Sequence, residues 1–355
     1  MTINNLQLDD HKLLYHLNVL HDWHQGKEIY PLTISIGPTR ACNYRCVFCA
    51  YDYLEHKPIY LDLDRIVKLS KDTAKRGTKS FFFSGDGEPL MNKELPDCIV
   101  QVYKNNIDTA LNTNGVLLNK EVSEKILPVM SWIRVSVNAG ESELYGKLHG
   151  TNSSMYHKVL NNLNDAVDIK KNKELKCTIG VQSLLLEENI GSLINLAKEL
   201  KRLGVDYFAL KPFLQHPSIN YTEKLDYNSE SVNFMLREIE NISSEKFRVV
   251  IRRESLKKIA LRNYERCLSF PFIADIDSKG DFYPCGPHIG NPMFCYGNIY
   301  DNDFDEIWQS EKRKRLEYYM QTSFDCSKCM PNCRNDAVNR FLWHIKQEPA
   351  HVNFI

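Results

Sequence analysis

The sequence predicts an α/β fold, a partial (β/α)6 barrel of the TIM type followed by a small cysteine-rich domain. Two observations support this prediction. Short β-rich runs alternate with longer amphipathic runs through residues 32–212, which is the pattern of parallel strands joined by helical crossovers. Beyond residue 213 this alternation stops, and six of the eleven cysteines lie between residues 267 and 333.

Six strand candidates follow one another, and each has the composition of a buried or half-buried β-strand. They are LTISIGP (32–38), KSFFFSG (79–85), DTALNTNG (108–115), WIRVSVNAG (132–140), LKCTIGVQSLL (175–185) and VDYFALKPF (205–213). Between them, residues 62–77 and 189–204 are amphipathic at helical spacing, and both end in glycine, a common helix stop. Short polar or glycine-rich motifs follow the first four strands. They lie at the C-terminal ends of the strands, where the active sites of such barrels are found.

The second part of the chain has a different pattern. We expect a loop over residues 215–231, a helix near 230–243 and one more strand over 246–255. Residues 270–286 predict a β-hairpin with residues 278–281 at its turn. The expected domains are an N-terminal extension (1–31), the barrel (32–245) and the cysteine-rich domain with its hairpin and a helix (246–355).

Composition narrows the class of protein. Lysine plus arginine and aspartate plus glutamate number 45 each, so we expect neither a nucleic acid nor a membrane as partner. No apolar run approaches the roughly 18–20 residues that span a bilayer, and the N-terminus is not a signal peptide. We therefore expect a cytoplasmic protein, where clustered thiols indicate metal rather than disulfides. Cys98 and Cys177 stand alone and are expected to be plain buried residues.

The first cysteine cluster directly follows the first strand. Cys42, Cys46 and Cys49 have the spacing C-x3-C-x2-C. Three close cysteines can hold three irons of a four-iron cluster and leave the fourth iron open to an outside ligand. On spacing alone, a zinc site with a distant fourth ligand and three unligated thiols remain alternatives.

Four motifs together resemble the radical S-adenosyl-L-methionine (radical SAM) superfamily. One is the cysteine triplet itself. Residues 85–89 (GDGEP) resemble the GGEP motif that follows the second strand in this superfamily, and residues 113–115 match its TNG motif. Residues 134–138 (RVSVN) resemble a fourth-strand segment that often reads R-V-S-L-D. The resemblance covers most of residues 32–212.

The resemblance implies a mechanism and a set of contacts. A 4Fe-4S cluster on Cys42, Cys46 and Cys49 would bind S-adenosyl-L-methionine (SAM) at its open iron and cleave it reductively. The resulting 5′-deoxyadenosyl radical would take hydrogen from the substrate, and a flavodoxin- or ferredoxin-type donor would supply the electron. The implied SAM contacts are Gly87, Glu88, Pro89, Asn114, Ser136 and Asn138. Two positions depart from the family: Asp86 replaces a common glycine, and Asn138 replaces a common acid, so it cannot serve as a base.

The second cysteine set resembles the opening of the SPASM and twitch domains that carry auxiliary clusters in this family. Cys267 and Cys285 form the motif C-x12-G-x4-C. Cys326, Cys329 and Cys333 form a later motif, C-x2-C-x3-C. The count favours one auxiliary 4Fe-4S cluster. The preferred ligands are Cys267, Cys285, Cys326 and Cys329, with Cys333 as a replacement or spare. A zinc ribbon built from the same four cysteines is the alternative, and Cys295 is expected to be structural.

Substrate contacts are expected where the sixth strand ends. Lys211, Gln215 and His216 follow it, and Arg252 could hold an anionic group. The leading hypothesis is oxidation of a small polar substrate of the sugar, nucleotide-sugar or aminocyclitol type, with the auxiliary cluster as electron acceptor. The alternatives are a SPASM-type peptide or protein maturase and a cluster-bearing electron carrier. Only about 31 residues precede the first strand, which is short for the peptide-binding domain of many maturases.

Overall fold

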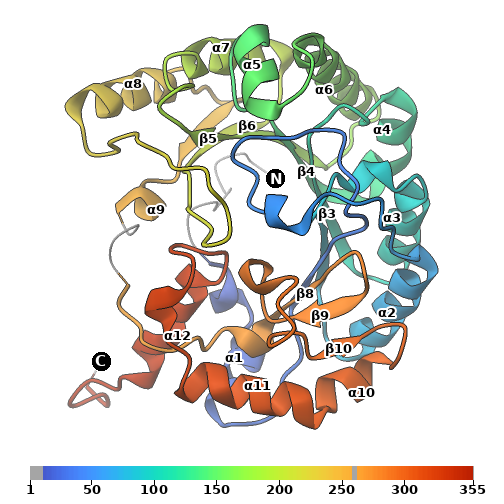
Figure 1. Ribbon diagram of the computed structural model, residues 1–355, viewed down its shortest axis with the longest axis vertical. Helices are drawn as coiled ribbons and strands as arrows, with labels where there is room; N and C mark the ends of the chain where they lie inside the picture. Colours follow the sequence, from blue (N-terminus) through green and yellow to red (C-terminus); the bar gives the residue numbers. More distant parts are fainter. Residues whose placement is uncertain (1–10, 258–261, 355) are drawn as a thin grey trace.

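The computed structural model describes residues 11–257 and 262–354. The first ten residues of the expected N-terminal extension therefore lie outside the described part of the chain. Within it, one curved sheet of ten strands runs in the order β10-β9-β8-β1-β2-β3-β4-β5-β6-β7. Figure 1 shows this sheet curling around the centre of the molecule, with helices along its outer face.

Seven parallel strands form the barrel wall. They are β1 (Thr33–Ile36), β2 (Ser80–Phe83), β3 (Asp108–Thr113), β4 (Met130–Ser136), β5 (Thr178–Leu185), β6 (Tyr207–Pro212) and β7 (Arg248–Ile251). Five of the first six fall within their predicted runs, β4 begins two residues before its run over 132–140, and β7 falls within the further strand expected over residues 246–255. The α/β barrel class is confirmed.

The outer helices connect these strands. They are α2 (Leu63–Lys75), α3 (Leu95–Lys104), α4 (Lys120–Ile126), α5 (Ser142–His149), α6 (Ser154–Asn172), α7 (Leu193–Leu203), α8 (Glu230–Glu240) and α9 (Arg253–Lys257). Helix α7 shows why the sequence forms this layer: Leu193, Leu196 and Leu200 are fully buried against the sheet at helical spacing. The helix ends at Gly204, whose left-handed φ of 84° suits glycine.

The predicted hairpin is present, and it also extends the barrel sheet. Strand β8 (Ile273–Ile276) pairs in parallel with β1, β9 (Asp281–Tyr283) returns antiparallel to β8, and β10 (Gly297–Asn298) pairs with β9. The sequence did not indicate the pairing with β1, because the two strands are far apart in the chain. Helices α10 (Phe304–Gln309), α11 (Glu311–Thr322) and α12 (Asp336–Lys346) complete this region.

The N-terminal segment packs against the C-terminal region. Helix α1 (Leu17–His24) packs against α12, whose Lys346 ammonium lies 5.6 Å from the centroid of the Trp23 ring. A small apolar cluster joins Leu13, Ile29 and Leu32 to Leu268, Phe272 and Leu342. The Trp308 indole nitrogen also donates to the Ile29 carbonyl at 2.9 Å. The two ends of the described chain therefore stabilise each other. None of the described helices is long and apolar enough to cross a membrane.

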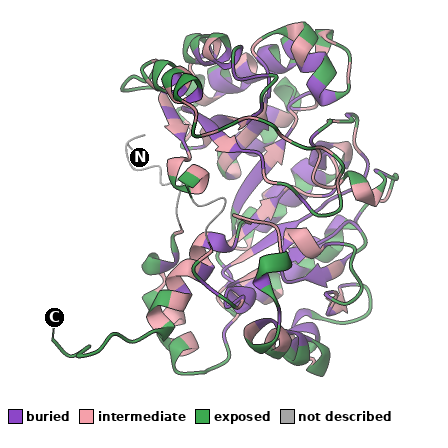
Figure 2. Cartoon of the chain, turned by 60° about the vertical axis from the view of Figure 1, so that its left-hand side comes forward, coloured by how far each residue is buried: buried purple, intermediate pink, exposed green. Residues whose placement is uncertain are grey.

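The inner face of the sheet is less buried and more polar than its outer face. On β4, Ile133 and Val135 are fully buried towards the helices, whereas the alternate residues Arg134 and Ser136 are partly exposed. Strand β5 repeats the pattern with Val181 buried and Gln182 partly exposed. Figure 2 shows the mixture of buried and intermediate residues along the strands and the exposed outer sides of the helices. A functional site is therefore expected inside the barrel.

Candidate active site

The cysteine triplet lies in the loop that follows β1. All three thiols are partly buried and unoxidised. Burial raises the pKa of Cys46 well above its usual value, and the nearby Cys49 and Cys42 sulfurs add to the rise. Burial and Cys42 likewise raise the pKa of Cys49 to about 11. Three thiols that resist ionisation together fit a site whose positive metal centre would hold them as thiolates.

The three sulfurs do not converge on a point that suits one ion. In the described residues, no group of three or more histidine, cysteine, aspartate or glutamate side chains is arranged to hold a single metal ion. A four-iron cluster spreads its thiolate ligands over different irons, so its ligands need no common point. The soft sulfur donors of the loop fit iron–sulfur chemistry.

The end of α5 packs onto the cysteine loop. The backbone N–H groups of Arg45 and Val47 donate to the carbonyls of His149 and Leu148 at 3.1 and 3.0 Å. Gly150 follows with a φ of 57°, and a Cβ there would lie 2.1 Å from the Arg45 carbonyl oxygen. The loop is therefore held by backbone contacts from a segment about a hundred residues away. His149 itself lies 3.4 Å from the Cys46 sulfur.

The GDGEP loop after β2 holds the other side of the cysteine loop. A Cβ on Gly87 would lie 2.4 Å from the Ala41 carbonyl oxygen, so only glycine allows this approach. The Glu88 N–H donates to the same carbonyl at 2.9 Å. Pro89 begins a short 3-10 turn, Pro89–Met91. Gly87 and Pro89 thus have packing roles that hold in the absence of any ligand.

Glu88 joins two loops through its buried carboxylate. Its oxygens accept from the Thr113 hydroxyl at 2.6 Å, the Asn114 N–H at 2.7 Å and the Leu90 N–H at 3.2 Å. Burial raises the pKa of Glu88, and these donors oppose the rise. The Asn114 side chain in turn donates to Asn43 in the cysteine loop at 2.7 Å. Glu88 therefore positions the loops around the cysteines.

The two candidates from β4 differ in their surroundings. Ser136 forms no hydrogen bond through its hydroxyl with any described residue. Asn138, just beyond the strand, is only 2% exposed, and its side chain is fully engaged. Its Oδ1 accepts from the Leu184 N–H at 2.7 Å, while its backbone N–H and Nδ2 both face His149 Nε2, at 3.1 and 3.3 Å. The inner face of β4 thus leaves the Ser136 hydroxyl available to a ligand, whereas Asn138 serves His149.

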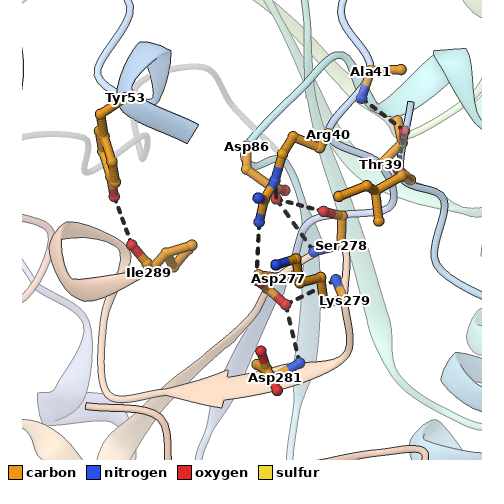
Figure 3. A network of polar contacts seen from close by, with 11 residues as sticks. Thr39, Arg40, Ala41, Tyr53, Asp86, Asp277, Ser278, Lys279, Asp281 and Ile289 are labelled. Atoms are coloured by element: carbon orange, nitrogen blue, oxygen red, sulfur yellow. Dashed lines mark hydrogen bonds and ion pairs between the residues drawn. The ribbon is translucent and has the colours of Figure 1, made fainter. Parts of the chain in front are cut away.

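A buried charge network links the cysteine loop to the hairpin (Figure 3). Arg40 lies between two carboxylates, with Nε 3.2 Å from Asp86 and Nη2 3.2 Å from Asp277. The Ser278 hydroxyl also donates to Asp86 at 2.7 Å. Burial, together with the nearby Asp86, raises the pKa of Asp277 to about 6. The departure Asp86 therefore has a structural reason: it pairs with an arginine two residues before Cys42.

Positive side chains gather on the inner face near the end of β6. Burial, followed by the nearby Arg252 and Arg134 guanidinium groups, lowers the pKa of Lys211 to about 8. Arg134 donates to the Tyr207 hydroxyl at 3.0 Å and to Gln182 at 3.4 Å. Neither Arg134 nor Lys211 forms an ion pair with a carboxylate of the described chain.

Arg253, by contrast, begins α9 and pairs with Glu240 at 2.6 Å. Two other substrate candidates lie in the loop after β6. Gln215 donates to the carbonyls of His216 and Ile219, at 3.2 and 2.9 Å. His216 is 3% exposed, stacks on Tyr53 and contacts the Pro287 carbonyl at 3.2 Å. The His216 contacts tie the loop after β6 to the C-terminal region, whereas the hydrogen bonds of the exposed Gln215 stay within its own loop.

Five C-terminal cysteines surround one small cavity of about 20 Å³. They are Cys267, Cys285, Cys326, Cys329 and Cys333. Burial raises the pKa of Cys285 well above its usual value, and Cys333, Cys329 and Cys267 add to the rise. Cys333 is thus as much part of this group as the four preferred ligands. Cys98 and Cys177 are buried as expected, at 4% and 1% exposure.

The fold and these two cysteine sites define a class: a parallel barrel protein with two sites for iron–sulfur clusters, one of them at the barrel mouth. Residues 36–200 match the model of the radical SAM superfamily, and residues 267–334 match that of the SPASM iron-sulfur cluster-binding domain. The chain is a radical SAM enzyme with a C-terminal SPASM domain. Its cofactors are SAM, the 4Fe-4S cluster of the radical SAM domain and an auxiliary cluster.

Curated relatives share modest identity with the chain. A tungsten-containing aldehyde ferredoxin oxidoreductase cofactor-modifying protein from Pyrococcus furiosus is 22% identical over 77% of this chain and 80% of its own length. A probable GTP 3′,8-cyclase from Methanocaldococcus jannaschii is 28% identical over 54% of this chain and 63% of its own. The chain thus spans less than two thirds of this cyclase.

Solved structures show the same fold. Streptococcus suis SuiB bound to SAM has a TM-score of 0.66 at 15% identity, covering 89% of this chain and 75% of its own. Native anSMEcpe with bound AdoMet has a TM-score of 0.60 at 20% identity, covering 87% of this chain and 88% of its own. SuiB was also solved with the precursor peptide SuiA, and anSMEcpe with a peptide.

Several residues of the site were not found from the sequence. His149 lies 103 positions from Cys46, and Asp277 lies 237 positions from Arg40. No local pattern marks either pair. Arg334, which donates to Ser35 inside the barrel and follows Cys333 directly, was also missed. A lone polar residue next to a helix end or a cysteine motif was the only available signal.

Proposed function

We propose that Cys42, Cys46 and Cys49 hold the SAM-binding cluster and that the chain abstracts hydrogen from a small, polar, anionic substrate. When bound, the cluster and SAM supply a 5′-deoxyadenosyl radical, with an electron from a flavodoxin- or ferredoxin-type donor. The chain's own residues position the reactants and exclude water. Ser136 is the candidate whose hydroxyl remains available for SAM, and Glu88 acts by fixing the loops around it.

For the auxiliary cluster we propose four ligands from the five C-terminal cysteines. Cys267, Cys285, Cys326 and Cys329 remain the preferred set, and Cys333 is close enough to replace one of them. A cluster there would supply an acceptor for one electron, which suits a two-electron oxidation of the substrate. The observation that supports one auxiliary cluster is that all five thiols border a single cavity.

The cations grouped on the inner barrel face support the proposal that the substrate has an anionic group. Lys211, Arg134 and Arg252 lie close enough for the two guanidinium groups to lower the Lys211 pKa. Lys211 and Arg134 have no carboxylate partner in the described part of the chain, and like charges brought together in a partly buried place cost free energy unless an anion joins them. A phosphate or carboxylate would be bound by charge-assisted hydrogen bonds, as in a sugar phosphate or nucleotide-sugar.

A peptide or protein maturase is the second candidate. SuiB and anSMEcpe, which share the fold, were solved with peptides. At 15–20% identity this likeness concerns the fold alone. A peptide with acidic side chains would satisfy the same cations, so the size of the substrate must be tested directly.

The test is anaerobic formation of 5′-deoxyadenosine by the reconstituted, reduced chain with SAM. Extract is split by ultrafiltration, and the small-molecule part is then divided on an anion exchanger. Stimulation by the retained anionic part is expected, and Lys211→Gln should raise the KM for it about tenfold or more, the size of one lost charged hydrogen bond. Arg253→Gln, whose guanidinium pairs with Glu240, is the matched control.

Three results would change this proposal. Stimulation by the macromolecular part alone would favour the maturase. Stimulation by the unretained small molecules would remove the anionic group from the substrate class. If a fully loaded protein formed no 5′-deoxyadenosine under any condition, the assignment of the cysteine triplet to SAM chemistry would be wrong.

A further inference from the structure

His149 is packed tightly against the cysteine loop. It is the last residue of α5, it is 1% exposed, and its Nδ1 lies 3.4 Å from the Cys46 sulfur. Aromatic rings enclose it: Tyr145 stacks on the imidazole at 4.1 Å between centroids, and Tyr44 and Phe48 from the cysteine loop meet it edge-on at 5.7 and 5.6 Å. This packing fixes which ring edge faces the sulfur.

The far side of the ring determines which nitrogen carries the proton. His149 Nε2 faces two donors of Asn138, the backbone N–H at 3.1 Å and the side-chain Nδ2 at 3.3 Å. That side-chain amide cannot be flipped, because its Oδ1 accepts from the Leu184 N–H at 2.7 Å. A nitrogen that faces donors must present its lone pair, so the proton of the neutral imidazole is assigned to Nδ1. The Nδ1–H therefore points at the Cys46 sulfur.

We propose that His149 is a positioning residue that donates an N–H···S hydrogen bond to Cys46 and thereby raises the reduction potential of the SAM-binding cluster. The inference rests on the proposed assignment of Cys46 as a cluster ligand. Reduction adds negative charge to the cluster and its thiolates, and a hydrogen-bond donor stabilises the more negative state. The cluster would then be easier to reduce for the electron donor.

This role gives a reason for the departure at position 138. A carboxylate there would place an acceptor beside Nε2, in competition with the backbone N–H of residue 138. The asparagine side chain instead adds a second donor, so both groups that face Nε2 favour the proton on Nδ1. His56 makes a weaker comparison: its Nε2 lies 3.7 Å from the Cys49 sulfur and also 3.7 Å from an Asp52 carboxylate oxygen, so the sulfur competes with a carboxylate for that nitrogen.

The test is a redox titration of the reconstituted full-length chain, followed by electron paramagnetic resonance. Only a cluster with an open iron can bind SAM, so the signal that changes on SAM addition identifies the relevant cluster. His149→Phe should lower the equilibrium constant for its reduction at least tenfold, about 59 mV for one electron. His149→Asn, which places an amide donor near the Nδ1 position, should restore most of this. Tyr145→Phe, which keeps the stacked ring and touches no sulfur, should leave the potential unchanged.

An unchanged potential in an iron-loaded His149→Phe protein would overturn the proposal. If that variant fails to fold, His56→Phe protein labelled with ¹⁵N-histidine is measured instead, because this change removes the other histidine near the cysteine loop. Pulsed resonance should then show a histidine nitrogen coupled to the SAM-responsive cluster, and its absence would refute the contact. If the SAM-responsive signal persists after Cys42, Cys46 and Cys49 are changed to Ala, the ligand assignment itself has failed, and the role of His149 fails with it.

Discussion

Removal of the Arg40 guanidinium should destabilise the protein more than the loss of any exposed ion pair. Arg40, Asp86 and Asp277 are 6%, 0% and 1% exposed, so water cannot replace the lost partner. At the observed 3.2 Å and an effective dielectric constant of about 20, each carboxylate is attracted to Arg40 by about 5 kcal/mol. Desolvation offsets much of this in the wild type, but breaking such a pair from one side typically costs about 3–5 kcal/mol.

The pH dependence of this loss has a definite sign. The folded-state pKa of Asp277, about 6, exceeds its ordinary value of 3.8, so its protonated form favours folding. That contribution is present below pH ~4 and is lost as the pH rises through about 6. Without Arg40 the two carboxylates repel each other when ionised. The destabilisation by Arg40→Gln should therefore be largest near pH 8 and smaller near pH 5.

The assay is urea unfolding of the reduced, iron-free chain at both pH values, followed by tryptophan fluorescence. The exposed pair Arg202–Glu199 provides the control, because Arg202→Gln should cost only about 0.2–1 kcal/mol. Adding Asp277→Asn to Arg40→Gln should recover part of the loss, since one uncompensated charge is removed. A cost at pH 8 no larger than that of the control, or a larger cost at pH 5, would refute the reasoning.

Three further predictions concern the cysteine loop. Replacing Cys42, Cys46 and Cys49 together by Ala should reduce the iron content from about eight to about four per chain, and zinc in place of iron would contradict the cluster assignment. Gly87→Ala should impair loading of that cluster, because the new Cβ meets the Ala41 carbonyl at 2.4 Å; normal iron content would refute this. Glu88→Gln should cost about 1–3 kcal/mol in thermal unfolding, since one carboxylate acceptor is replaced by a donor that faces donors; an unchanged Tm would count against it.

The sequence predicted the barrel because its strands are local features. Runs such as residues 79–85 and 205–213 are apolar enough to be recognised alone, and β2 and β6 fall inside them. The pairing of β8 with β1 could not be predicted, because the two strands are far apart in the chain and no local sequence pattern indicates which strands pair in parallel. The domain boundary at residues 245/246 stays a prediction: β7 lies just beyond it and still pairs with β6.

The candidate site was predictable to the same extent. Cysteine spacing indicates both candidate cluster sites: the first triplet lies in one loop, and the C-terminal set combines a short motif with two cysteines from earlier segments. The partners that surround them come from elsewhere: His149 from the end of α5, Asp277 from the hairpin. Arg252 stays a predicted substrate contact: it follows β7 and lies close enough to Lys211 to lower the pKa of that lysine, a proximity that the sequence did not indicate. His216 has the chemistry of a substrate contact but is used to hold a loop.

The parallel pairing of β8 with β1 has a consequence for dissecting the enzyme. A barrel fragment ending before β8 would leave the backbone of Thr33–Ile36 with one side unpaired, directly before the cysteine loop. Exposed edges of this kind recruit other chains and promote aggregation. Strand β8 of the SPASM region therefore protects the edge of the first barrel strand from pairing with other chains. A soluble fragment that carries only the SAM cluster would need this edge blocked by design, for instance with a proline or an inward-pointing lysine.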